Sequence, residues 1–237
     1  NLRRDVTAPQ VVVLGGVESY GRYIPRPFPT LIEEATGLTV VNLGCPNAGP
    51  DAWLGDPAVL EVVGKAQIVV VQVPSAADLT NRFYAVHPRR NDRFLRASPL
   101  LQTIYREVDF TEFSFTRHMI HMLQALFQTA PDRFALVAEE LRAAWVGRMT
   151  LLLQRVSGQS VLLWLSDAPP GPKSDMLRRE PMLVDAAMLA KVRPHAAATV
   201  EVVPSAAARA LGTEGMVIPS LAEPAARGLP GVAAHAE

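Results

Sequence analysis

The sequence is poor in cysteine and carries no net charge, and each shortage excludes a class of protein. Cys45 is the only cysteine in 237 residues, so the chain can form neither an internal disulfide nor a cysteine-based zinc site. Lys and Arg together number 23, as do Asp and Glu, so the formal net charge is zero. A dedicated nucleic-acid-binding domain normally carries a basic excess that contacts phosphates. We therefore expect no nucleic-acid partner.

Long apolar runs and a targeting segment are also missing. No run reaches the roughly 18 apolar residues that a membrane-spanning helix needs. Residues 1–10 lack the charged-then-apolar order of a signal peptide, although the sequence does not begin with Met and further residues can precede it. We expect a cytoplasmic protein without a membrane span. The sequence is also compatible with a homo-oligomer.

Hydrophobic residues, by contrast, make up 49% of the chain and charged residues only 19%, which is ample for a buried core. Five short runs are β-branched or aliphatic almost throughout. Strands that are apolar on both faces are typical of a parallel sheet covered by helices. The five predicted strands are Val11–Gly15, Leu38–Leu43, Ile68–Val73, Val161–Ser166 and Thr199–Val203.

Helical periodicity fills the segments between these strands. The predicted helices are 30–36, 51–64, 115–127, 131–156 and 181–192. Residues 77–129 interrupt the alternation and indicate an insertion after the third strand, over the carboxyl edge of the sheet. The expected fold is an α/β three-layer sandwich with a flavodoxin-like parallel sheet of order 2-1-3-4-5. We expect residues 1–237 to form one domain that contains this helical insertion.

A glycine pair, Gly15 and Gly16, follows the first strand and allows the backbone to turn sharply and approach a ligand. The spacing up to Gly21 does not fit a dinucleotide fingerprint, and no Gly-Lys-Ser/Thr follows for a phosphate-binding loop. We expect no cofactor and no metal. A tight structural turn explains the glycines equally well.

Three blocks, 14–21, 41–49 and 69–77, resemble the first three motif blocks of the SGNH (GDSL-type) hydrolase superfamily in their order along the chain. The resemblance implies a flavodoxin-like fold and an esterase, lipase or acyl-transfer activity. Residues 81–95 and 109–118 also resemble an uncharacterised bacterial family of unknown function, which implies no activity.

The chain departs from the superfamily at its catalytic positions. The Gly-Asp-Ser of the first block falls on Gly15-Gly16-Val17, so a valine stands where the nucleophile is expected. Ser19 is the nearest substitute for it. The second block places an oxyanion donor near Asn47–Gly49, and Asn81 is the nearest asparagine to the third. His235 lacks the aspartate that the superfamily has three residues earlier. These changes disfavour a Ser-His-acid mechanism, which needs nucleophile, base and oxyanion donors together.

Arginines are concentrated in residues 81–96 and are interleaved with aromatic residues. Arginine binds phosphate, sulfate or carboxylate with a planar fork of donors. Arg82, Arg89 and Arg90 are candidate ligands for an anion, and His87 among them is the candidate catalytic histidine. The alternative is a structural network in which the arginines pair with acidic residues of the segment 107–112.

The leading hypothesis is an SGNH-like protein whose cleft binds an anionic or sugar-like small molecule, with non-standard group-transfer or ester hydrolase activity. Ser19, Asn47 and His87 are its candidate catalytic residues. The candidate ligand-binding residues are Gly15, Gly16, Gly49, Asn81, Arg82, Arg89 and Arg90. One alternative is a non-catalytic scaffold protein that kept the fold. Another is a transferase that uses a sulfate- or phosphate-bearing donor.

Overall fold

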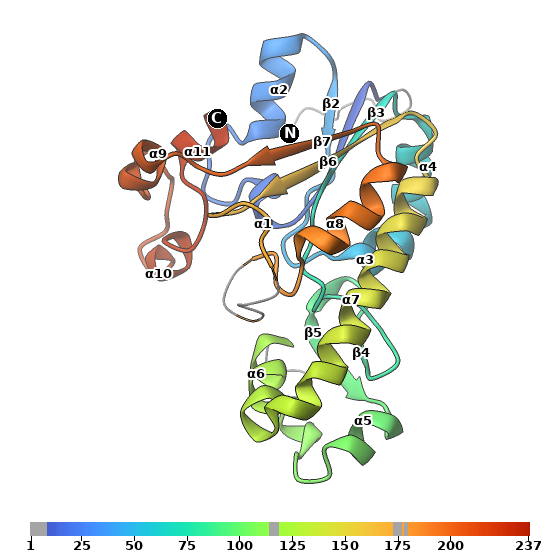
Figure 1. The fold of residues 1–237 in the computed structure, drawn as a ribbon. Coiled ribbons are helices and arrows are strands. Elements are labelled where there is room, and N and C mark those ends of the chain that lie inside the picture. Colours follow the sequence, from blue (N-terminus) through green and yellow to red (C-terminus); the bar gives the residue numbers. More distant parts are fainter. Residues whose placement is uncertain (1–8, 114–118, 173–176, 178–179) are drawn as a thin grey trace.

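A computed structural model of the chain describes residues 9–113, 119–172, 177 and 180–237. Its centre is a five-stranded sheet of order β2-β1-β3-β6-β7, in which every pairing is parallel (Figure 1). This arrangement confirms the predicted α/β class and the strand order 2-1-3-4-5. The strands are β1 (Val11–Leu14), β2 (Val40–Asn42), β3 (Ile68–Gln72), β6 (Gln159–Leu165) and β7 (Ala198–Val202).

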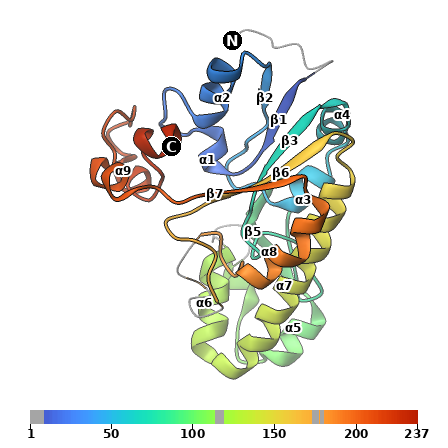
Figure 2. The same cartoon turned by 45° about the horizontal axis from the view of Figure 1, so that its top comes forward.

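Helices cover the two faces of the sheet unequally (Figure 2). The helices α3 (Pro50–Leu54), α4 (Pro57–Lys65), α7 (Pro131–Gln154) and α8 (Ala186–Val192) lie on one face, over the larger part of the core. The other face carries α2 (Phe28–Thr36) and the short α11 (Val232–Ala236), beside a smaller cluster of β1 and β2 valines. The helices α1 (Val17–Tyr20), α9 (Ala206–Leu211) and α10 (Glu223–Ala226) and the 3-10 turn η2 (Arg193–His195) complete the described sandwich.

Two predicted helices differ from the observed ones. In each, an aspartate caps a helix N-terminus at a position that the spacing of apolar residues did not indicate. The helix predicted at 51–64 is two helices, since the Asp56 side chain accepts a hydrogen bond from Ala58 N and starts α4. The helix predicted at 181–192 begins only at Ala186, because Asp185 accepts from Met188 N at 2.9 Å. An N-cap side chain satisfies backbone donors that the first turn leaves unpaired.

The insertion after β3 contains an antiparallel hairpin that the sequence did not predict. It consists of β4 (Tyr84–His87) and β5 (Arg90–Ala97), followed by α5 (Pro99–Ile104), η1 (Phe110–Phe113) and α6 (Met119–Thr129). The helix predicted at 115–127 corresponds to α6, and its residues 115–118 lie outside the described part of the chain. That residues 1–237 form one domain stays a prediction.

The hairpin, α5, η1 and α6 form a lobe against the N-terminal half of α7 (Figure 1). The rest of α7 lies along the sheet, and the buried Trp145 of this helix donates to Pro74 O at 2.9 Å. The one long helix therefore joins the lobe to the carboxyl edge of the sheet. Within the described residues, no helix has both the length and the apolar character needed to cross a membrane.

Candidate functional site

A cleft of about 200 Å³ opens at the carboxyl edge of the sheet. Its walls come from the β1–α1 turn, the loop after β2, and the segments after β3, β6 and α10. Open α/β sheets bind their ligands at this edge. None of the described lining residues is Lys, Arg or His. The polar and charged side chains that line the cleft are Glu18, Asn47, Gln72, Ser75, Asp78 and Glu180.

Gln72, the last residue of β3, organises the turn after β1. Its Oε1 atom accepts hydrogen bonds from Ser19 Oγ (2.5 Å), Gly16 N (3.2 Å) and Ser19 N (3.3 Å). Its Nε2 donates to Glu18 Oε2 at 2.7 Å. Ser19 is fully buried, so its hydroxyl links α1 to β3 behind the cleft and does not line it. The sequence analysis missed Gln72, although a polar residue at the end of an apolar run was a usable signal.

The same contacts explain Gly15, which lies behind the cleft with Ser19. A Cβ atom on Gly15 would lie 2.0 Å from Ser19 Oγ and 2.6 Å from Gln72 Oε1. We expect Gly15→Ala to lower the free energy of unfolding by about 1–3 kcal/mol, because packed side chains must shift. Urea denaturation measures this change in the free energy of unfolding. The control is Gly147→Ala inside α7, where a Cβ meets nothing within 4 Å and stability should rise by up to about 1 kcal/mol. Equal effects at the two positions would refute the steric argument.

Val17 itself faces the cleft, together with Gly16 of the same turn. The position at which the resemblance places a serine nucleophile therefore presents an isopropyl group to any ligand. A valine side chain has no group that can attack a carbonyl or donate a proton. Chemistry in this cleft has to come from other residues of its lining.

Two carboxyl groups of the lining have pKa values that burial raises. Glu180 is exposed as a residue, but its carboxyl turns inward, where it accepts from the Ser75 hydroxyl and from Met182 N (3.3 Å). Ser75 is buried and also accepts from Met182 N at 2.8 Å, so the serine and the glutamate hold each other in place. Burial, with Glu18 nearby, raises the pKa of the Glu180 carboxyl above its ordinary value.

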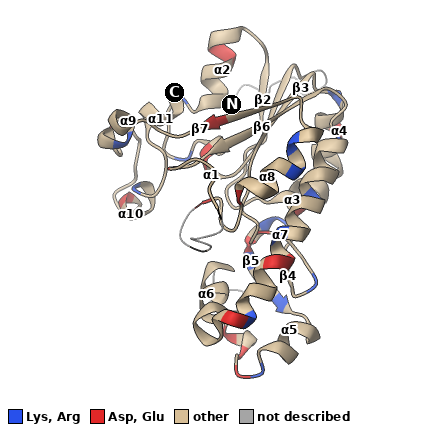
Figure 3. Cartoon of the chain, viewed as in Figure 1, with Lys and Arg blue, Asp and Glu red and all other residues tan. Residues whose placement is uncertain are grey.

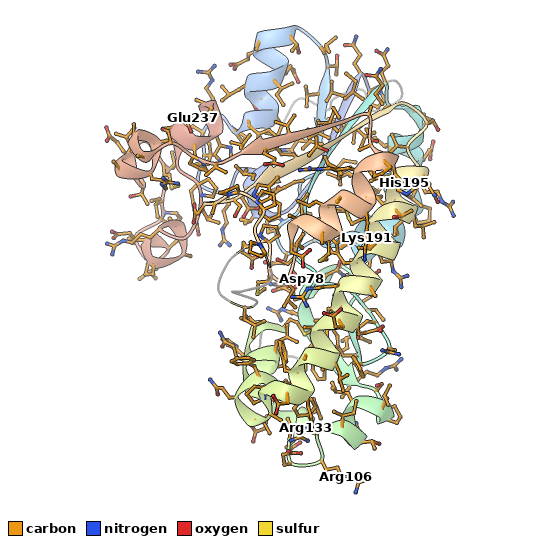
Figure 4. All side chains as sticks on the ribbon, in the orientation of Figure 1. Asp78, Arg106, Arg133, Lys191, His195 and Glu237 are labelled. Carbon is orange, nitrogen blue, oxygen red and sulfur yellow. The ribbon has the colours of Figure 1, made fainter. Side chains whose placement is uncertain are left out.

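Asp78 follows β3 and lies between the sheet and the lobe (Figure 4). Burial of its carboxyl raises the pKa well above the ordinary range, and the charges of Glu180 and Asp92 raise it further. A carboxyl group that keeps its proton near neutral pH can both donate and accept hydrogen bonds. The cleft therefore brings together three carboxyl groups, and burial makes those of Asp78 and Glu180 keep their protons to a higher pH than ordinary acids do.

The loop after β2 forms the opposite wall and is fixed by Asn91 of β5. Asn47 lines the cleft and has a left-handed backbone with φ of 64°. Gly49 does not line it, since its N–H donates to Asn91 Oδ1 at 2.8 Å. A Cβ at Gly49 would lie 2.2 Å from the carbonyl oxygen of Asp78, which accounts for a glycine there. This N–H is occupied within the protein and is not available to an oxyanion.

The remaining predicted site residues lie in or beside the hairpin and do not line the cleft. Asn81 Oδ1 accepts from Phe83 N and Tyr84 N, and His87 Nδ1 accepts from Arg89 N at the hairpin tip. Arg82 pairs with Glu140 of α7 at 2.7 Å, and Arg90 lies 3.9 Å from Asp92. Arg89 is exposed.

Arg82 and Arg90 thus have acidic partners, but not the ones that the structural-network alternative expected. The expected partner Glu107 pairs with Arg133 of α7, and Asp109 binds Thr111. Both signs of charge occur on the hairpin and α7 (Figure 3). Of the predicted residues the structure brings Gly16 and Asn47 together at the cleft and leaves the arginines and His87 outside it. In the described ranges, no group of His, Cys, Asp and Glu side chains could hold a metal ion.

Two solved hydrolases are similar to this chain in fold. The lipase Lip_vut3 from a goat rumen metagenome is 14% identical, with a TM-score of 0.44 over 97% of this chain and 95% of that one. A phospholipase A1 from Streptomyces albidoflavus NA297 is 13% identical, with a TM-score of 0.45 over 86% and 83% of the two chains. No curated protein matches the sequence. The resemblance to the SGNH superfamily stays a prediction.

A family model covers almost the whole sequence, from the segment before β1 to the end of α11. The match spans residues 2–237 and includes both the cleft and the hairpin. The chain therefore belongs to the family described as domain of unknown function DUF6473.

Proposed function

We propose that the cleft binds a neutral, hydroxyl-rich small molecule of the sugar-like class and transfers a group with Asp78 as the proton donor. The observation that carries this proposal is the raised pKa of the Asp78 carboxyl in a cleft that Glu18 and Glu180 also line. Carboxyl and carboxylate groups in one cleft offer the donors and acceptors that hydroxyl groups match. A positioned acid of this kind contributes about 10²–10⁴ to a rate.

An anionic ligand fits this lining less well than a neutral one. No described lysine, arginine or histidine lines the cleft, so an anion would meet no positive charge there, and any ionised carboxyl group of the lining would repel it. Titration of the whole chain with D-glucose and, separately, with inorganic phosphate distinguishes the two classes. We expect saturable, cleft-localised NMR shifts with glucose. Binding of phosphate alone at the cleft would refute the proposal and favour the transferase with an anionic donor.

The non-catalytic scaffold is the second candidate, and Val17 is the observation that favours it. Both proposals exclude Ser19 as a nucleophile, because it is buried against Gln72, and both assign the buried Ser75 hydroxyl to its hydrogen bond with Glu180. We therefore expect no labelling by a fluorophosphonate probe. Labelling that disappears in Ser19→Ala would refute both. A scaffold protein would differ from the group-transfer protein in showing no sugar binding at the cleft.

Asp78→Asn should lower group transfer at least 100-fold while raising the free energy of unfolding at pH 7. The folded state raises the pKa of Asp78, so its stabilising contribution is present below the unfolded pKa near 4 and is lost as pH rises through the folded pKa. Asparagine does not ionise, so the stability gain should grow as the pH rises from about 4 to 7.

Paired measurements of activity and urea denaturation between pH 4 and 8 test this expectation. The control is Asp132→Asn at the exposed first turn of α7, which should leave activity unchanged and, by removing a charge at a helix N-terminus, lower stability by no more than about 1 kcal/mol. An Asp78→Asn protein that is less stable than the wild type at pH 7 would show that the aspartate is charged and paired, and would exclude it as the acid.

A further inference from the structure

A second cavity lies on the face of the sheet that carries α2. It is a groove of about 350 Å³ between α2, the strands β6 and β7, and α11. Its floor is formed by alternate residues of the strands, such as Val161 and Leu163 of β6 and Val200 of β7. Val200 is 45% exposed, although it faces a site lined almost entirely by apolar side chains. Small-molecule sites are typically concave and apolar, with volumes upward of roughly 300 Å³.

The polar end of this groove is the imidazole of His235 in α11. His235 is 6% exposed, and its ring stacks on Phe28 of α2 with the centroids 5.9 Å apart. Its Nδ1 accepts from Phe28 N at 3.2 Å, so Nδ1 carries no proton. Burial lowers the pKa of the imidazole to about 4, so the ring is neutral at pH 7 and its proton is on Nε2. No described residue accepts from this Nε2–H.

A carboxylate at the same end restricts the charge of a ligand. Glu237 lines the groove, and Ser205 N donates to its Oε2 at 2.8 Å. Hydrogen bonding by the Ser205 side chain, and then by its backbone N–H, lowers the pKa of the Glu237 carboxyl, which is therefore charged at neutral pH. A ligand that carries a carboxylate would meet a like charge here, whereas a neutral carbonyl oxygen would meet a hydrogen-bond donor.

The groove is distinct from the acidic cleft. Leu165 at the end of β6 is the one described residue that lines both cavities. Figure 4 shows Glu237 beside α11 and Asp78 between the sheet and the lobe, well apart in that view. Substitutions elsewhere in the groove therefore leave the cleft lining intact, and the two sites can fail or succeed separately in experiments.

We propose that the groove binds an uncharged, medium-chain alkyl carbonyl compound. The alkyl chain lies against Val161, Leu163 and Val200, and the carbonyl oxygen accepts from His235 Nε2–H. This site goes beyond the proposed function of the cleft and does not depend on it. Burial of the chain supplies the affinity, and the single donor orients the molecule.

The test compares 2-nonanone with octanoate, which have the same alkyl chain and differ in whether the carbonyl end is neutral or charged. Binding to the whole chain at pH 7 is followed by protein-observed NMR titration. We expect 2-nonanone to shift groove residues saturably and to bind at least tenfold more tightly than octanoate. Absence of saturable 2-nonanone binding, or tighter binding of octanoate, would overturn the proposal.

Two alanines on exposed helix surfaces give a matched pair of blocking and control variants. Ala35 of α2 lines the groove, whereas Ala143 of α7 does not. We expect Ala35→Trp to weaken 2-nonanone binding at least tenfold and Ala143→Trp to leave it unchanged. If Ala35→Trp does not fold, Val200→Trp on the edge strand fills the same space. Unchanged binding in a folded blocking variant would overturn the site.

His235→Asn tests the donor, because its amide oxygen can still accept from Phe28 N while the Nε2–H is lost. The affinity for 2-nonanone should fall about two- to tenfold, the net effect of one hydrogen bond. Sedimentation of the wild type tests the competing occupant of an apolar face, a second copy of this chain. A dimer that Ala35→Trp converts to a monomer would show that the second copy occupies the groove, and would overturn the ligand proposal.

Discussion

Asn91→Ala is expected to lower the free energy of unfolding by about 3 kcal/mol, because it leaves buried backbone donors without an acceptor. The Asn91 side chain is completely buried, and its Oδ1 accepts from Gly49 N (2.8 Å) and Ala52 N (3.0 Å). Its Nδ2 donates to His87 O at 2.9 Å. One side chain thus holds the hairpin tip against the loop that forms a wall of the cleft.

Asn81→Ala provides the matched control, since Asn81 Oδ1 also accepts from two backbone N–H groups, those of Phe83 and Tyr84. Asn81 is only half-buried, so water can replace its amide, and we expect a loss of no more than about 1 kcal/mol. Urea denaturation of both variants measures the difference. Similar small losses would show that the loop after β2 does not depend on the hairpin.

Asn91→Ala should also affect the cleft, because the loop that Asn91 holds in place carries Asn47. Asn91 N donates to Asn47 O at 2.9 Å, in addition to the side-chain contacts with Gly49 and Ala52. If the proposed sugar-like ligand binds in the cleft, Asn91→Ala should weaken that binding as well as lower stability. This coupling would mean that the insertion positions the cleft wall through Asn91. Its arginines do not line the cleft.

The central sheet was predictable because its signals are local. Each of its predicted strands is a short apolar run, and such runs are typical of a parallel sheet that helices cover on both faces, although β7 itself is largely exposed. The hairpin was not predictable in this way, since β5 reads RNDRFLRA and its charges suggested either an anion site or a structural network of ion pairs. Asn91, Asp92 and Phe94 are buried among charged residues there, and contacts with distant parts of the chain, such as the loop after β2, bury them.

The cleft was predictable in position and not in chemistry. The glycine turn and the loop after β2 identified the carboxyl edge of the sheet, and Gly16 and Asn47 do line the cleft. The acidic groups come together through contacts between distant residues. Ser75 lies in the third motif block, but nothing in the sequence pairs it with Glu180, which is 105 positions away. The sequence analysis named Arg82 as a candidate ligand for an anion, whereas in the structure Arg82 forms an ion pair with Glu140 of α7.

His235 illustrates the same limit from the other end of the chain. The sequence analysis compared it only with the superfamily motif, from which it departs. Its partner Phe28 is 207 positions away, so only the folded chain shows that the imidazole is a buried acceptor for a backbone N–H. The groove beside it is equally invisible in the sequence, because Val161, Leu163 and Val200 look like ordinary residues of strands covered on both faces.

Burial of His235 predicts a large pH dependence of stability. The imidazole has a pKa of about 4 in the folded protein and 6.5 as its ordinary value. Above pH 6.5 both states hold a neutral ring, and the full stability is present. As the pH falls toward 4, His235 takes up a proton in the unfolded state but stays neutral in the folded state, so stability is lost. The difference of about 2.5 pKa units corresponds to about 3 kcal/mol.

The measurement is the difference in unfolding free energy between the wild type and His235→Asn, followed from pH 7.5 down to pH 4. A difference is needed because the raised pKa values of Asp78 and Glu180 act in the opposite direction, adding stability as the pH falls. We expect the advantage of the wild type over His235→Asn at pH 7.5 to shrink by about 3 kcal/mol by pH 4. Parallel profiles would mean that the ring is accessible to protons in the folded state. In that case His235 could not serve as the neutral donor of the groove, so this profile tests the chemistry of the site without any ligand.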